Sequence, residues 1–429
     1  MAFNYIWVSF FVVAFLVALF RVLCYFNHDL LLEMGFSALA KFGNKEVLQE
    51  MVQSTFNMAE TSVEITIYLM GIMTLWMGIM KVGEEGGAVN VLTRMVSPFF
   101  KRLFPGVPAD HPAIGSMMMN FSANMLGLDN AATPLGLKAM NQLQTLNEEG
   151  KGESASNAMI MFIVLNTSGL TLIPVSVMAL RAQAGAANPS DVFLPILLAT
   201  YFASLGGLIA VSIKQKISLL QPVLLGWLAA ITAFVFGMMY LFNNMPQYRV
   251  NTISSLFGNG VILTIIILFF LMATRKKVNV YNAFIDGAKE GFQVAVKVLP
   301  YLVAMLVAIG LLRVSGTLPG ITYLLKQFFS AFLSDTRFVD ALPTALMKPL
   351  SGSGARGMMV DQMQTFGADG FVGRLASIFQ GSTETTFYTL AVYFGAVNIK
   401  NTRYALGAGL FADLCGIIAS IFIAYLFFG

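Results

Sequence analysis

The residues with the clearest chemical potential form a polar stretch near the C-terminal end of the chain. This stretch reads QGSTETT, Gln380–Thr386, and apolar runs flank it on both sides. Its single carboxylate, Glu384, would need partners inside a bilayer, where a buried charge is costly. The neighbouring amide and hydroxyl groups can all form hydrogen bonds. The side chains expected to bind a solute here are Gln380, Ser382, Thr383, Glu384 and Thr385.

Two chemical functions suit this stretch, and a structural role is the alternative. A helix broken at Gly381 would expose backbone N–H groups at the start of its second half. Hydroxyls and carbonyls could coordinate Na⁺ near Thr383 and Glu384, or Glu384 could carry a proton. Alternatively, Glu384 pairs with a cation of the other half of the chain and only holds two helices together.

A second candidate site reads KPLSGSGAR, Lys348–Arg356. Its glycines permit a tight turn, and N–H groups released by that turn would favour an anion. Lys348 and Arg356 add positive charge, so a carboxylate or phosphate would suit this site. The alternative is that Lys348 neutralises Glu384 or Asp361. The residues expected to bind a solute here are Lys348, Ser351, Gly352, Ser353 and Gly354.

The third polar group lies in the first half of the chain and is rich in amides. An asparagine can bond a nucleobase or a sugar hydroxyl, and a site built for such a partner rejects analogues that lack it. The alternative is that these amides cap short helices. Pro174 follows them and would break or kink its helix. The expected binding residues are Asn120, Ser122, Asn124, Asn130, Asn166, Thr167 and Ser168.

The composition shows where these polar groups must reside. Apolar residues make up 57% of the 429 residues and charged residues only 11%, against about 25% in a soluble domain. Several windows approach the ~20 apolar residues that span a bilayer. We therefore expect an all-α polytopic protein of the cytoplasmic membrane, with the lipid bilayer as a partner. There is no basic face for nucleic acid, and the two histidines and two cysteines form no metal-binding cluster.

The hydrophobic pattern predicts about nine spans and two re-entrant hairpins. The hairpins are Ala113–Met140 and Ala341–Met363, in which a polar centre separates two arms too short to cross. An amphipathic surface helix is expected at Val91–Leu103. The nine spans are Tyr5–Tyr25, Ser62–Met80, Asn157–Leu180, Asp191–Ile213, Gln221–Phe242, Leu256–Thr274, Val294–Leu312, Leu375–Val397 and Tyr404–Phe428.

The two halves of the chain match in order. Val63–Lys81 corresponds to Ala295–Arg313, and LNTSGLTLI at Leu165–Ile173 corresponds to QGSTETTFY at Gln380–Tyr388. Five spans separate the equivalent positions, so the repeats are expected to be inverted. Paired interrupted segments in inverted halves are the best sequence indication of a transporter's binding site. The alternative is a duplication that now has only a structural role.

The chain divides into four parts on this reading. Residues 1–58 form an N-terminal membrane helix and loop, 59–213 the first repeat, 214–290 linking helices, and 291–429 the second repeat. Basic residues gather in the loops at one side, which predicts a cytoplasmic N-terminus and an external C-terminus.

These stretches resemble a fusion of the spore maturation proteins A and B, whose halves carry the nucleoside recognition, or Gate, domain. The first half resembles the family through DHPAIGSMMMNFSANMLGLDNAATPLGLKAM and NTSGLTLIPVSVMALR. The second half resembles it through YLVAMLVAIG, KPLSGSGARG, GRLASIFQGSTETTFYTLAVYFGAV and KNTRYALGAGLFADL. More distantly, the domain is similar to concentrative nucleoside transporters and the membrane part of ferrous-iron transporter B. The resemblance implies two hairpins and two broken helices that meet at a central site.

Secondary transport of a small polar solute by alternating access is the function expected from these features. The resemblance suggests a nucleoside-like solute, whereas Lys348, Arg356 and the SGSG tip suggest a small organic anion. Na⁺ or H⁺ is the expected coupling ion, no other cofactor is expected, and a homo-oligomer is compatible with this reading. The alternative is a non-transporting membrane scaffold in a cell-envelope or spore maturation process. An enzyme is not expected, because no nucleophile–base pair stands out.

Overall fold

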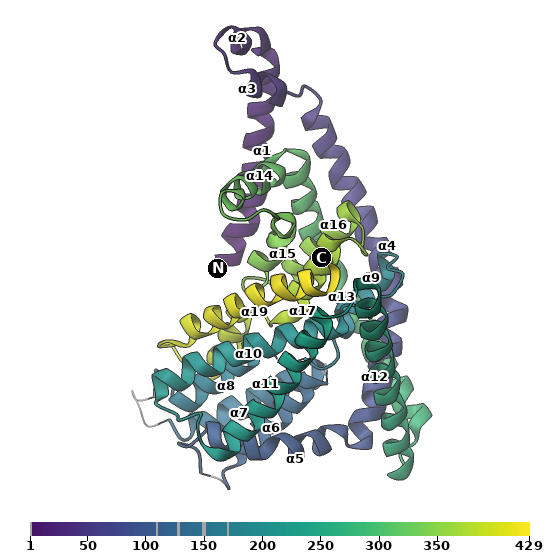
Figure 1. The fold of residues 1–429 in the computed structure, drawn as a ribbon, viewed down its shortest axis with the longest axis vertical. Helices are drawn as coiled ribbons and strands as arrows, with labels where there is room; N and C mark the ends of the chain where they lie inside the picture. The colour runs from purple at the N-terminus through teal and green to yellow at the C-terminus, as the bar shows by residue number, and fades with distance from the viewer. Residues whose placement is uncertain (1, 109, 127–128, 148–151, 170) are drawn as a thin grey trace.

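The chain folds into helices joined by short loops, in a computed structural model that describes all residues except 1, 109, 127–128, 148–151 and 170. Seven of the described helices are long and apolar enough to cross a membrane, which confirms a multi-pass membrane protein. Figure 1 traces their order along the chain. They are α1 (Ala2–Phe26), α4 (Val47–Gly86), α10 (Phe193–Gln215), α11 (Pro222–Asn243), α12 (Gln247–Arg275), α13 (Val280–Val314) and α19 (Ala405–Phe428).

The other two predicted spans are broken helices. Asn157–Leu180 comprises α8 (Asn157–Ser168) and α9 (Val175–Gln183), separated by Gly169 at a φ of 46° and by Pro174. Leu375–Val397 comprises α17 (Phe371–Ser382) and α18 (Thr386–Ala396). A break at Gly381 is wrong by two residues, because Gly381 lies inside α17. A Cβ there would approach Ile196 of α10 within 2.8 Å, so this glycine permits close helix packing instead.

Each half also contains a helical hairpin, as the sequence predicts. The first is α6 (Pro112–Met125) followed by α7 (Asp129–Gln144). The second is the short η3 (Arg337–Ala341) and α15 (Leu342–Met347), followed by α16 (Gly352–Phe366). None of these arms reaches the ~20 residues needed to span a bilayer, so each hairpin must enter and return.

An amphipathic helix precedes each hairpin, although the sequence predicts only the first. The first, α5 (Ala88–Phe100), is continued by the short η1 (Lys101–Leu103), and the second is α14 (Thr317–Ser330). Each starts after a glycine in the left-handed region, Gly87 at a φ of 89° and Gly316 at 88°. A glycine adopts that conformation without steric cost, so the same sharp turn occurs in both halves.

Equivalent helices of the two halves pack against each other in opposite directions. In the α4–α13 pair, Gly78 lies against Phe284, whereas Gly310 lies against Met58. In the α10–α19 pair, Gly206 lies against Cys415, and Ala203 lies against Gly416. Residue numbers therefore rise along one helix as they fall along its partner. This antiparallel pairing is the arrangement that an inverted repeat requires.

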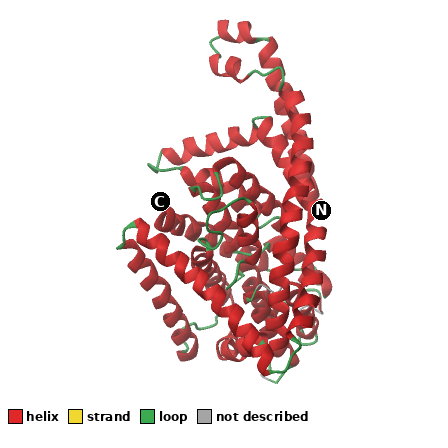
Figure 2. Ribbon diagram, turned by 90° about the vertical axis from the view of Figure 1, so that its right-hand side faces the viewer, coloured by secondary structure: helices red, strands yellow, loops and turns green. Residues whose placement is uncertain are grey.

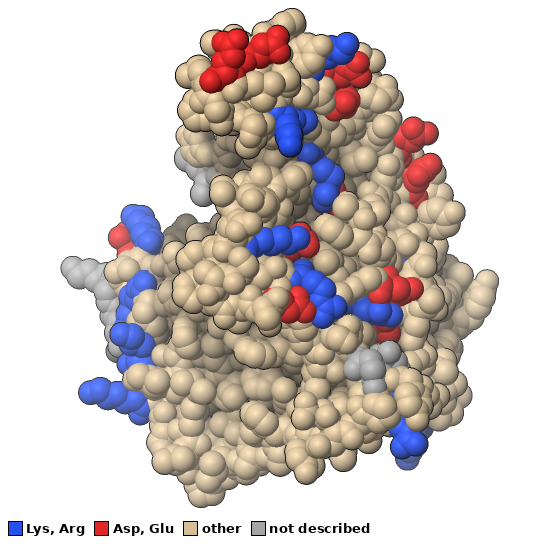
Figure 3. Space-filling view, turned by 45° about the horizontal axis from the view of Figure 1, so that its top comes forward, with Lys and Arg blue, Asp and Glu red and all other residues tan. Residues whose placement is uncertain are grey.

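The N-terminal part of the chain projects from this helical body. Figures 1 and 2 both show α2 (His28–Glu33) and α3 (Ser37–Phe42) at the projecting end, beyond α1 and the start of α4. Figure 3 shows charged side chains gathered at that end and in small groups, while broad areas carry no charge. Uncharged side surfaces suit contact with lipid.

Candidate functional site

The two helix breaks touch each other at the centre of the molecule. The backbone N–H of Glu384 in the second break donates to the carbonyl of Thr167 at the end of α8, at 2.8 Å. A Cβ on Gly169 would lie 3.1 Å from Cγ of Glu384. The repeat alignment places Thr167 opposite Ser382, so the contact joins corresponding parts of the two halves.

Each break is also bonded to the hairpin tip of its own half. The N–H of Leu172 donates to the Met125 carbonyl at 2.8 Å, and the N–H of Phe387 donates to the Pro349 carbonyl at 3.0 Å. Leu172 and Phe387 are equivalent positions of the repeat. The two halves therefore make the same backbone hydrogen bond at equivalent positions. Movement of either tip would act directly on the adjacent break.

A cavity of about 100 Å³ lies where these segments meet. Its apolar wall comes from α4, from the first break with α9, and from α13. The residues of this wall are Met73, Trp76, Met77, Met80, Ile173, Pro174, Val175, Val177 and Val294. Its polar lining is Asn124, Thr171, Ser176, Lys348, Arg356, Gln380, Thr383 and Glu384. Pockets for drug-sized ligands measure roughly 300–1,000 Å³. This cavity therefore suits an ion, a few waters or a very small solute in the conformation described.

The charges around the cavity favour an anion. Lys348 is buried, and Arg356 is partly buried with an Nε that has no hydrogen-bond partner among the described residues. Oε1 of the buried Gln380 likewise has no partner there. Glu384 is exposed, so its carboxylate remains in contact with solvent. Buried polar atoms without partners are uncommon, and the Arg356 donor and the Gln380 acceptor could both be satisfied by a polar ligand.

Only part of the predicted binding set lines this cavity. Lys348, Gln380, Thr383 and Glu384 line it from the second half, and Asn124 lines it from the first. The Asn130 side chain lies outside the described part of the structure. The predicted residues that do not line this cavity are Asn120, Ser122, Asn166, Thr167, Ser168, Ser351, Gly352, Ser353, Gly354, Ser382 and Thr385.

The amides and hydroxyls of the first half bond mainly to one another and to the backbone. Asn120 donates to the Ala132 carbonyl at 2.8 Å, and Asn124 donates to Oδ1 of Asn166 at 2.7 Å. Asn166 in turn donates to the Phe162 carbonyl at 2.8 Å. Further local bonds join Ser122 to Thr93, Thr167 to Val164 and Ser168 to Leu165. This chain of bonds positions Asn124 at the cavity wall.

The SGSG tip of the second hairpin packs tightly and caps a helix. Oγ of Ser351 accepts from the Gly354 N–H at 3.0 Å and lies 3.2 Å from Oγ of Ser353. A Cβ on Gly352 would lie 2.7 Å from Oγ1 of Thr385, so this glycine allows α16 and α18 to begin side by side. Ser382 donates to the Phe379 carbonyl at 3.0 Å.

The proposed pairing of Lys348 with Asp361 is wrong. Nε of Arg313 donates to Oδ1 of Asp361 at 2.8 Å, and the two side chains form an ion pair. Arg313 and Asp361 thus join the end of α13 to α16, whereas Lys348 lies at the tip of the hairpin and lines the cavity.

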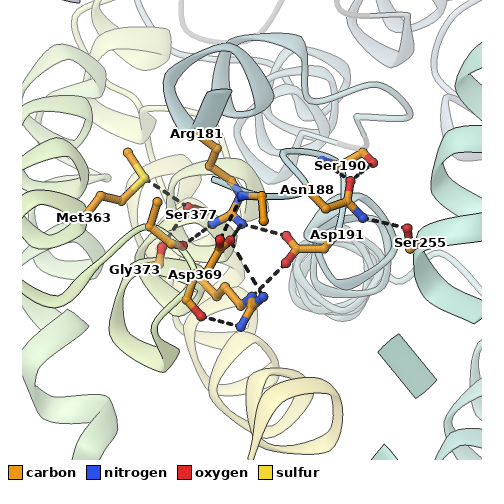
Figure 4. Close-up of polar contacts among 12 residues, drawn as sticks. Arg181, Asn188, Ser190, Asp191, Ser255, Met363, Asp369, Gly373 and Ser377 are labelled. Carbon is orange, nitrogen blue, oxygen red and sulfur yellow. Dashed lines mark hydrogen bonds and ion pairs between the residues drawn. The ribbon is translucent and has the colours of Figure 1, made fainter. Parts of the chain in front are cut away.

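A buried ion cluster away from the cavity joins the two halves, and the sequence reading missed it (Figure 4). Arg181 of α9 is fully buried and donates to Asp191 at 2.8 Å, to Asp369 at 3.1 Å and to the Ala368 carbonyl at 2.6 Å. Nε of Arg374 donates to the other oxygen of Asp191 at 2.7 Å. The two arginines lie in the broken helices and the two aspartates in the adjoining loops, and charges at the ends of apolar segments are the signal that could have revealed them.

The repeat places a second contact of the same kind between the loops that precede α8 and α19, but this one is exposed. Lys400 forms an ion pair with Glu153 at 2.8 Å, and Arg403 donates to the Ala155 carbonyl at 3.0 Å. The hydrogen bond to Glu153 raises the pKa of Lys400 above its usual value. The loop that enters each broken helix is therefore fastened to the other half, once by buried charges and once by exposed charges.

Comparison with known proteins agrees with this geometry. Residues 66–184 and 295–400, more than half of the chain, match the family described as nucleoside recognition, and these ranges contain both hairpins and both breaks. Spore maturation protein B of Bacillus subtilis (strain 168) is 51% identical over 159 residues, which are 37% of this chain and 88% of that protein. Spore maturation protein A of the same strain is 42% identical over 162 residues, 38% of this chain and 82% of that protein. The chain therefore belongs to the nucleoside recognition (Gate) family and resembles a fusion of the two spore maturation proteins.

Proposed function

We propose that this membrane protein is a secondary transporter that moves a small organic anion across the cytoplasmic membrane by alternating access. The observation that carries the proposal is the cavity at the contact between the two helix breaks, where Lys348 and Arg356 face one exposed carboxylate. The excess of positive charge favours a carboxylate or phosphate group. In this proposal the N-terminus is cytoplasmic and the C-terminus is external.

The arrangement of the repeats supports alternating access. Each break is bonded to its own hairpin tip, and the two breaks are bonded to each other. A hairpin that moves away would open the cavity toward one side, and its symmetry mate would open it toward the other. Binding at a midplane site between inverted repeats is the pattern of many secondary transporters.

The solute class follows from size and charge. The family description names nucleosides, but a cavity of about 100 Å³ would have to widen to admit one. An anion with few heavy atoms needs less rearrangement and can satisfy the Nε of Arg356, which has no partner among the described residues. A nucleoside-like solute therefore remains the second candidate to test.

The test is the thermal stability of the purified protein with small carboxylates, inorganic phosphate, nucleosides and nucleobases. A ligand that binds only the folded state at 100 times its Kd stabilises it by about 2.7 kcal/mol. We expect an anion-specific rise in melting temperature that Arg356→Met abolishes. The matched control is Arg275→Met, which removes an exposed arginine at the end of α12 and should leave the rise intact. If nothing in the panel raises the melting temperature, the scaffold alternative is favoured.

A further inference from the structure

A second carboxylate lies behind the cavity, inside the helix pair that joins the two halves. Asp413 is in the middle of α19 and is 2% exposed. One of its oxygens, Oδ2, accepts from Oγ1 of Thr386 at 2.7 Å. The other oxygen, Oδ1, is buried and has no hydrogen-bond partner among the described residues. A buried carboxylate with an oxygen that accepts no hydrogen bond is energetically costly in a bilayer, and such a residue indicates a function.

The surroundings of Asp413 connect it to the hairpin tip. Its partner Thr386 is the first residue of α18, and the adjacent Phe387 donates its N–H to Pro349 of the tip at 3.0 Å. Lys348 precedes Pro349, lines the cavity and interacts electrostatically with Asp413. The carboxylate and the cavity are therefore both influenced by one cation, which the tip of the second hairpin supplies.

The neighbouring helices provide little other charge. Glycines on α19 bring its backbone close to the break: a Cβ on Gly409 would lie 2.8 Å from Thr386, and one on Gly416 would lie 3.0 Å from Thr383. The other titratable side chain on this part of α19 is Cys415, which faces Gly206 of α10. Glu384 is exposed at the cavity, and α8 presents the hydroxyl of Thr167 toward Gly409. Among the described residues, Lys348 is therefore the cation that acts on Asp413 through its charge.

We propose that Asp413 carries the coupling proton of the transporter. When an anion binds Lys348, the negative charge of Asp413 is no longer balanced by Lys348, and Asp413 takes up the proton instead. In this step a hydronium ion gives its proton to Oδ1: one of its O–H bonds breaks and leaves water, a new O–H bond forms at Oδ1, and the carboxylate becomes a neutral acid. The inference rests on the proposed function and assigns coupling to Asp413 rather than to Glu384. A proton suits this site better than Na⁺, because a metal ion would need several oxygen ligands close to the Lys348 ammonium.

Coupling between solute and proton follows from the balance of charge at Lys348 and Asp413. Without solute, Lys348 and Asp413 are both charged and compensate each other. An anion at Lys348 satisfies the ammonium and leaves the Asp413 charge uncompensated in a buried place, which favours protonation. Solute and proton would then be bound together, and each would favour the binding of the other by linkage.

The test is infrared difference spectroscopy of the purified full-length protein in lipid vesicles, which detects the C=O band of a protonated carboxyl group as pH is varied. We expect a band that Asp413→Asn removes and Glu384→Gln retains. Lys348→Met removes the compensating charge and should shift the appearance of the band upward by about one to three pH units. This second variant tests the proposal even if Asp413→Asn fails to fold.

Three results would overturn the proposal. The band could persist in Asp413→Asn, or its pH dependence could be unchanged in Lys348→Met. Alternatively, replacing K⁺ by Na⁺ at constant pH could abolish the band in a manner that depends on Asp413, and the coupling ion would then be Na⁺. If the band behaves as expected while no solute raises the melting temperature, the Asp413 assignment is supported and the transport proposal is contradicted.

Discussion

Removal of the Arg181 side chain should destabilise the protein more than removal of any exposed cation. The guanidinium is fully buried and makes three bonds that link α9 to Asp191 and to the loop that enters α17. Arg181→Met would retain most of the apolar volume while leaving two carboxylates and a carbonyl without this partner. Breaking a buried pair by removing one member costs about 3–5 kcal/mol. Because Asp191 keeps its bond to Arg374 at 2.7 Å, we expect a loss of about 3 kcal/mol.

The natural control is the equivalent contact in the other half. Lys400 is paired with Glu153, but their side chains are 74% and 63% exposed. Many surface ion pairs contribute nothing measurable, so Lys400→Met should not change stability detectably. The assay is the free energy of unfolding in mixed micelles, from an SDS titration followed by circular dichroism. If Arg181→Met is no more destabilising than Lys400→Met, the buried cluster does not fasten the two halves together.

Two further predictions concern packing and the cavity. Gly291→Ala would place a methyl group against the Met73 carbonyl and should cost about 1–3 kcal/mol in the same assay. Gly71→Ala is its control, since a Cβ at that helical position meets nothing within 4 Å, and equal effects of the two changes would contradict the close α4–α13 packing. Glu384→Gln should change the free energy of unfolding by less than about 0.5 kcal/mol because Glu384 is exposed. The same variant should alter solute-dependent stabilisation, and an unaltered ligand response would show that this carboxylate does not contact the solute.

The sequence was sufficient to predict the elements that follow from composition and local chemistry. Long apolar runs predicted the spanning helices, and Pro174 predicted the first break, where the structure also places Gly169 in the left-handed region. The polar centres of the two hairpins and the order of the repeats were also readable, because each half repeats the same series of elements. Of the two amphipathic helices, α14 was missed because it contains a single basic residue, Lys326, whereas Val91–Leu103 contains three.

The contacts between distant segments could not be predicted in the same way. Gly381 looked like a helix breaker, but packing against Ile196 requires a glycine inside a continuous helix. The asparagines of the first half resembled a binding site, yet most of their hydrogen bonds are made to neighbours. The Arg181–Asp369 pair joins residues 188 positions apart. Asp413 is buried and bonded to Thr386 at the second break, which the sequence of α19 alone does not reveal. Such relations depend on tertiary structure.

Alternating access is the central claim, and the accessibility of one cavity residue from each side of the membrane tests it most directly. We would introduce Ser176→Cys after replacing Cys24 and Cys415 with alanine, and label oriented vesicles with an impermeant maleimide from either side. Ser420→Cys, at a buried position of α19, is the unreactive control. We expect Cys at position 176 to react from both sides, and a stabilising anion to reduce labelling from each. Reaction from one side alone, unchanged by any solute, would contradict alternating access through this cavity.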